Sequence, residues 1–227
     1  MPDHVLVAEG LSKRFSSGGQ PVTVLTDLSF RLAAGESLAL VGRSGSGKST
    51  LLNLLCGLQN PDEGTVSVAG ELFGKSGKPG SDERWAELRR RSIGVVFQQA
   101  NLMPALSLVD NVRLRGHLAG HGAGGEREWL ERLGVGPEAH RYPDQVSGGQ
   151  AQRAALAMVF AMAPSVILAD EPTGSLDRHT ADEVADCLFA IQRDTGCALV
   201  LATHDRELAS RCDHLLDLSA PHLNRTP

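Results

Sequence analysis

The chain has 227 residues, which is enough for one globular domain with an inserted subdomain. Charged and apolar residues occur in proportions ordinary for a soluble domain, and the formal net charge of −5 argues against binding nucleic acid through bulk positive charge. We therefore expect no nucleic-acid partner. The cysteines form no C-x-x-C pair, which favours separate buried thiols in a reducing compartment over a metal or redox site.

No stretch of the sequence predicts a membrane span. Residues 1–4 lack a basic segment followed by an apolar core, so we expect no signal peptide. The longest apolar run, 154–163, is shorter than the about 20 residues that a spanning helix needs. Any link to a membrane is therefore expected to go through a partner.

Residues 5–41 are expected to form strands. Apolar and polar residues alternate over 28–32, the pattern of a half-buried strand, and the polar, glycine-rich segment 16–21 indicates a hairpin or loop. Phe15, just before that segment, has two interpretations that its position leaves open. The ring could pack against its neighbours, or an adenine base could stack on it.

A glycine-rich turn with the spacing G-x-x-x-x-G-K-S joins the apolar run 38–41 to the helical run 51–55. Its glycines allow successive N–H groups to point into one concavity, and the helix start adds partial positive charge there. Lys48 can reach the β- and γ-phosphates, and the Ser49 hydroxyl can bind Mg²⁺. The turn predicts a nucleoside-triphosphate site formed by Gly42, Arg43, Ser44, Gly45, Ser46, Gly47, Lys48, Ser49 and Thr50.

The segment after this helix continues the strand pattern. We expect a turn at 61–64, a strand through Val66 and Val68, an exposed loop over 74–82, a charged helix over 83–91 and a buried strand over 93–97. The basic run at the end of the charged helix is expected to be a solvated face.

Strand patterns stop at about residue 99 and helical periodicity follows, over 106–118 and 126–133. The parallel-sheet pattern resumes later, which predicts an insertion and not a separate domain. The fold class is therefore α/β: residues 1–98 and 164–227 form the core with an antiparallel β subdomain, and residues 99–163 form the helical subdomain.

A Ser-Gly-Gly turn, at Ser147, Gly148 and Gly149, precedes a helix expected over 151–162. Such a turn at a helix N-terminus can receive an anion. Taken alone this signal is weak, because many helices start in this way.

Asp170 and Glu171 follow the apolar run 165–169 directly. Two adjacent carboxylates at this place are costly unless a metal or water satisfies them, and ligands bind at this end of the strands in an open parallel sheet. We predict that Asp170 anchors Mg²⁺ and that Glu171 acts as the general base for an attacking water. His204 follows the strand expected over 197–202. It could cap or pack locally, or it could contact a γ-phosphate.

These residues together closely resemble the ATP-binding subunit of an ABC transporter, over essentially the whole chain. The segment 42–50 matches the Walker A motif of that family, and 166–171 matches Walker B with its catalytic glutamate. The other matches are Phe15 with the A-loop aromatic, Gln98 with the Q-loop, Val146 to Gln150 with the signature motif, Ser175 to Asp177 with the D-loop and His204 with the switch histidine.

The resemblance implies a head-to-tail dimer of two such chains. ATP on one copy's Walker A motif would be covered by the other copy's Ser147, Gly148, Gly149 and Gln150, with Asp177 contributing from the D-loop. Glu171, His204, Lys48 and Gln98 would be catalytic, and Ser49, Gln98 and Asp170 would hold Mg²⁺. The partner would be a membrane permease, which places the chain in the cytoplasm on the inner face of the membrane.

Fewer residues indicate the branch within the family than indicate the family. Glu171 to Asp177 resembles the branch that serves lipoprotein release, macrolide export and cell division. An importer of polar amino acids, a mechanical regulator that transports nothing, and an ABC protein of DNA repair or translation are the alternatives. Departures from the family pattern are Val146 for leucine, Met158 for arginine and a short helical insertion.

Overall fold

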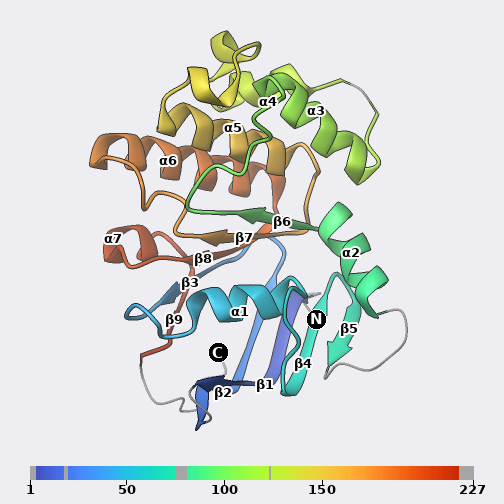
Figure 1. The fold of residues 1–227 in the computed structure, drawn as a ribbon, viewed down its shortest axis with the longest axis vertical. Helices are drawn as coiled ribbons and strands as arrows, with labels where there is room; N and C mark the ends of the chain where they lie inside the picture. The colour runs from blue at the N-terminus through green and yellow to red at the C-terminus, as the bar shows by residue number, and fades with distance from the viewer. Residues whose placement is uncertain (1–3, 18–19, 75–80, 123, 220–227) are drawn as a thin grey trace.

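The computed structural model describes residues 4–17, 20–74, 81–122 and 124–219, and within them the chain forms two sheets with helices around them (Figure 1). This arrangement confirms the predicted α/β class with one parallel and one antiparallel sheet. Among the described residues, no helix is both long enough and apolar enough to cross a bilayer.

The parallel sheet positions the residues of the predicted site. Its strand order is β6-β7-β8-β3-β9, and the hydrogen-bonded pairs are all parallel. The strands are β3 (Ser37–Val41), β6 (Ile93–Val96), β7 (Val166–Asp170), β8 (Ala198–Ala202) and β9 (His214–Asp217). In the register, Ala202 lies opposite both Leu40 and Asp170. The ends of the three central strands are therefore level, so the segments that follow them meet at one edge of the sheet.

The antiparallel sheet has the order β2-β1-β4-β5, and Ser17 of β1 pairs with Gln20 of β2 within the segment expected to be a hairpin or loop. The strands are β1 (His4–Ser17), β2 (Gln20–Ala33), β4 (Glu63–Val68) and β5 (Glu71–Gly74). The sequence did not predict β5, and β4 begins at Glu63, inside the expected turn. A Cβ on Gly64 would lie 2.4 Å from the Glu9 carbonyl oxygen, so β1 and β4 can approach only over a glycine.

Helices cover both faces of the parallel sheet (Figure 1). Helix α1 (Lys48–Leu55) packs on one face through Leu51, Leu52, Leu54 and Leu55. Helices α5 (Gly148–Phe160) and α6 (Arg178–Thr195) pack on the other. Alternate residues of β7 serve the two cores, Leu168 on the α1 side and Ile167 on the α5 side. Each fully buried leucine contributes about 1.5–3 kcal/mol.

The charged helix, α2 (Ser81–Arg91), does not present its whole basic run to solvent. Arg89 donates hydrogen bonds to the carbonyl oxygens of Cys56 and Gly57, at 3.0 and 3.2 Å, and so caps the end of α1. Arg115 of helix α3 (Leu108–Ala119) donates to the carbonyl oxygens of Arg89 and Arg90 at the end of α2. The expectation of a solvated face is wrong for Arg89, because its guanidinium group bonds to the carbonyl oxygens at the end of α1. The expected loop before α2 lies mostly outside the described residues.

Helical structure dominates the segment between β6 and β7. It consists of α3, α4 (Glu126–Arg132), the 3₁₀ turns Gly136–Glu138 and Pro143–Gln145, and α5. The buried side chain of Asn111 fixes the loop before α3, because its amide group bonds to the backbone of Met103, Leu106 and Ser107. A short helix, α7 (Arg206–Ala209), follows β8 directly after His204 and Asp205.

Candidate active site

The glycine-rich turn after β3 needs its glycines. Gly47 has φ +101°, and a Cβ there would lie 2.8 Å from Cγ1 of Val24. A Cβ on Gly42 would lie 2.4 Å from Oγ of Ser46. A side chain at either position would therefore change the path of the turn. The Ser46 hydroxyl oxygen is buried without a hydrogen-bond partner in the structure.

Helix α1 starts without a side-chain cap. Its first residue is Lys48, and the preceding Gly47 offers no side-chain oxygen to the free N–H groups of the first turn. Those groups and the helix dipole make the start of α1 receptive to an anion. The Lys48 ammonium group donates to the Gly42 carbonyl oxygen at 3.0 Å and is 11% exposed, so it lies beneath the turn.

Glu171 lies between Lys48 and His204. One of its carboxylate oxygens is 3.9 Å from Nζ of Lys48, and the other is 2.7 Å from Nδ1 of His204. An ionised carboxylate only accepts hydrogen bonds, so an ionised Glu171 pairs with the form of His204 that carries a proton on Nδ1. Glu171 has φ +48° and is not glycine, and its N–H donates to the Ala202 carbonyl oxygen. A strained backbone of this kind costs about 1–3 kcal/mol and is typical of functional sites.

His204 neither caps a helix nor packs in the core, the two local roles that its position in the sequence allowed. Its side chain is 72% exposed, so it does not pack in the core, and the neighbouring Asp205 is the residue that caps α7. Asp170, the last residue of β7, stands beside Glu171 in the chain. Lys48, Glu171 and His204 thus meet at the edge of the sheet, directly after Asp170 ends β7.

Gln98 joins the same edge through its backbone. Its carbonyl oxygen accepts a hydrogen bond from the Ser175 hydroxyl at 3.1 Å, which ties the segment after β6 to the segment after β7. Buried Gln152 of α5 donates to the Phe97 carbonyl oxygen at 2.8 Å. No local pattern indicates this role of Gln152, because its partner lies 55 positions away in the chain.

The Ser147 turn is separate from this cluster. Helix α5, which it starts, lies on the opposite face of the parallel sheet from α1 (Figure 1). The Ser147 hydroxyl accepts from the N–H of Gln150 at 3.2 Å, and the Gln150 side chain accepts from the N–H of Ser147 at 2.9 Å. A Cβ on Gly149 would lie 2.2 Å from Cγ2 of Thr180 at the start of α6.

Asp177 and Phe15 are the two remaining predicted site residues. Asp177 caps α6, and its hydrogen bonds from Thr180 lower the pKa of the Asp177 carboxyl. Phe15 is 38% exposed at the end of β1, beside the ammonium group of Lys13 at 5.6 Å. Phe15 is therefore not a fully buried core residue, and stacking on an adenine stays a prediction.

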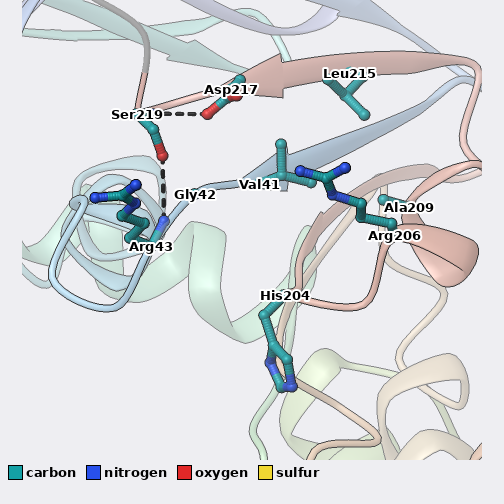
Figure 2. Close-up of a pocket in the computed structure, with 9 residues that line it drawn as sticks. All are labelled: Val41, Gly42, Arg43, His204, Arg206, Ala209, Leu215, Asp217 and Ser219. Carbon is teal, nitrogen blue, oxygen red and sulfur yellow. Dashed lines mark hydrogen bonds between the residues drawn. The ribbon is translucent and has the colours of Figure 1, made fainter.

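A cavity of about 550 Å³ adjoins the glycine-rich turn on the side of β9 (Figure 2). The turn and the His204 loop stand on two sides of it, and Arg206 points into it from α7 (Figure 2). Its lining residues are Val41, Gly42, Arg43, His204, Arg206, Ala209, Leu215, Asp217 and Ser219.

Comparisons with known proteins agree with this geometry. A family model described as ABC transporter matches residues 25–174. The uncharacterized ABC transporter ATP-binding protein YbbA of Escherichia coli is 41% identical, with 95% of each chain covered. The lipoprotein-releasing system ATP-binding protein LolD of Bordetella pertussis is 43% identical, covering 94% of this chain and 92% of that one. A dimeric post-hydrolysis structure of the ATP-binding cassette MJ0796, bound to ADP and Pi, has a TM-score of 0.83, 32% identity and 94% coverage of both chains.

The chain therefore belongs to the ABC transporter family, as its motifs predicted. Within that family it is an ATP-binding cassette, the ATP-hydrolysing subunit.

Proposed function

We propose that this ATPase drives a membrane permease of the lipoprotein-releasing type, with the residues around Glu171 performing the hydrolysis. The observation that carries the residue roles is the convergence of Lys48, Glu171 and His204 at one edge of the sheet. The likeness to the lipoprotein-releasing ATP-binding protein supports the choice of permease.

The reaction needs positioning and charge stabilisation more than covalent chemistry. The N–H groups of residues 42–50 and the Lys48 ammonium group would hold the β- and γ-phosphates, and Phe15 would stack on the adenine. Glu171 would orient and deprotonate the attacking water. With Nδ1 of His204 held 2.7 Å from Glu171, Nε2 on the other side of the exposed ring would face the γ-phosphate.

Oxygen donors at the same edge suit Mg²⁺. The Ser49 hydroxyl, the Asp170 carboxylate and the side-chain oxygen of Gln98 are the hard ligands that this ion takes in proteins. Bound with the nucleotide, Mg²⁺ supplies positive charge against the phosphate oxygens.

A second copy would complete the site. Ser147, Gly148, Gly149 and Gln150 lie on the other side of the sheet from their own Lys48, so in a head-to-tail pair they would cover the partner's nucleotide, with Asp177 beside them. The dimeric arrangement of the similar cassette supports this. We also propose that residues 99–163 act as a helical subdomain against the core of 1–98 and 164–227. That subdomain would transmit closure to the permease at the inner face of the membrane.

Replacing Glu171 with glutamine tests the residue roles. The variant should lose turnover by about 10²–10⁴-fold, because a positioned general base contributes this much, and should still bind ATP. Steady-state phosphate release and nucleotide titration measure the two quantities. Glu131→Gln, at an exposed ion pair of α4, is the matched control and should hydrolyse normally. Hydrolysis near the wild-type rate in Glu171→Gln would remove Glu171 as the base.

Co-purification tests the permease. A four-span permease with a large extracytoplasmic domain, recovered with the chain, would support the lipoprotein-releasing type. Recovery of a six-span importer permease would contradict it. A four-span partner without lipoprotein release in reconstituted membranes would favour a mechanical regulator.

A further inference from the structure

A cluster of charged side chains joins the start of α6 to the start of α7. Arg178 is the first residue of α6. Its guanidinium group lies 3.4 Å from Asp205 and forms a short ion pair with Glu207, both on the α7 side. It also lies 3.3 Å from Asp182, one turn further along α6.

Arginine is a poor choice at this position on local grounds. The start of a helix carries partial positive charge, so a cation in the first turn is unfavourable. Nothing within α6 except Asp182 offsets that cost, whereas Asp205 and Glu207 come from another element. The ion pairs with Asp205 and Glu207 therefore explain why an arginine is tolerated at position 178.

The contact reaches the segment that carries His204. Asp205 follows His204 directly and caps α7, because one of its carboxylate oxygens accepts from the N–H groups of Glu207 and Leu208 at 2.8 and 3.2 Å. Its other carboxylate oxygen faces Arg178. A residue on α6 thus holds the cap next to the histidine.

The segments after β7 and β8 are joined twice. The inner join is the 2.7 Å contact between Glu171 and His204, and the outer join is the Arg178 cluster. His204 is 72% exposed and has little packing of its own to fix its position. The orientation of the exposed His204 side chain therefore depends on both the Glu171 contact and the Arg178 cluster.

We propose that Arg178 is a positioning residue for ATP hydrolysis, which holds the His204 segment in register with Glu171. This inference rests on the proposed roles of Glu171 and His204. Arg178 itself touches neither of them in the described structure, so it acts through Asp205 and Glu207.

The effect should be moderate, because Arg178 is 59% exposed and solvent screens its ion pairs. Exposed ion pairs are individually weak, and a network of three supports a fall in kcat of about three- to tenfold for Arg178→Ala. The KM for ATP should stay the same, because no nucleotide-binding residue is altered. Arg178→Lys keeps the charge and should recover most of the rate.

Arg211→Ala is the matched control. Arg211 forms a 2.9 Å ion pair with Asp186, which also joins α6 to the segment after α7 but involves neither Asp205 nor Glu207. The kcat of Arg211→Ala should equal that of the wild type. Thermal melting of Arg178→Ala and Arg211→Ala should show any general loss of stability.

The decisive measurement adds Arg178→Ala to His204→Ala in the full chain, together with its permease if hydrolysis requires one. If Arg178 acts through His204, the second change should cause no further fall in kcat. An equal fall in both backgrounds, or a wild-type kcat in Arg178→Ala, overturns the inference. A wild-type chain without ATPase activity would instead contradict the proposed function, so the two failures can be told apart.

Discussion

Helices α1 and α5 both begin with a glycine-rich turn, and both turns were expected to receive an anion. They differ in how the first N–H groups are used. The start of α1 has no side-chain cap, so its N–H groups face the turn unpaired. The start of α5 has a complete capping box, in which Ser147 and Gln150 satisfy each other.

The difference shows that a similar sequence can build two kinds of site. We propose that the turn before α1 holds a ligand within one chain, since it combines an uncapped helix start with the ammonium group of Lys48. The Ser147 turn is satisfied by itself and lies across the sheet, which suits a surface that meets a ligand held by another copy. Three substitutions, at Gly47, Ser147 and Asp177, test this contrast, and changes at Gly70 and Ser107 serve as controls.

Gly47→Ala should have the largest effect. The new methyl group would clash with Val24 and force a left-handed backbone on alanine, so the turn must move. We expect ATP affinity to fall about 100-fold or more, as for loss of the charged contacts that hold a phosphate. Nucleotide titration measures this.

Gly70→Ala separates backbone strain from the clash. Gly70 has φ +83° in the turn between β4 and β5, with open space around it. The variant should lose about 1 kcal/mol of stability and bind ATP normally. Equal affinity of Gly47→Ala and the wild type would show that the turn before α1 is not built for phosphate.

Ser147→Ala should have an intermediate effect. It removes the cap of α5, which costs about 1 kcal/mol, and leaves the α1 turn untouched. ATP affinity of the single chain should therefore be unchanged while hydrolysis falls. Ser107→Ala removes the corresponding cap of α3 and should cost similar stability without loss of hydrolysis. A loss of ATP affinity in the Ser147 variant would mean that the two turns are not separate within one chain.

Asp177→Asn should have the smallest effect and extends the contrast to α6, whose cap is a carboxylate. Hydrogen bonds from Thr180 lower the pKa of Asp177, so the charged cap stabilises the fold above the unfolded-state pKa and this stabilisation is lost as the pH falls through the folded-state pKa. Asparagine caps as well but does not titrate. Urea unfolding between about pH 5 and pH 3 should show a shallower loss of stability in the variant. Identical pH profiles would contradict this role of the carboxylate.

The sequence by itself indicated most of the strands and helices, though not β5 or α7, and it contains the motifs from which the active site was predicted. Each of these is encoded within about ten neighbouring residues: alternation over 28–32 gives a half-buried strand, and the spacing around Lys48 gives a turn and a helix start. The sequence analysis placed Glu171 at the end of a parallel strand, where ligands bind, and the structure brings Lys48 and His204 to the same carboxylate.

Only the tertiary structure decided the roles of several polar residues. Arg89 was expected in solvent and instead caps α1, Gln152 anchors the backbone at Phe97, and Arg178 reaches α7. Their partners lie about 27 to 55 positions away in the chain. A free carbonyl oxygen or a capping carboxylate at a helix end can accept a hydrogen bond from any donor side chain that the fold brings close to it. The local sequence pattern does not show which side chain that will be.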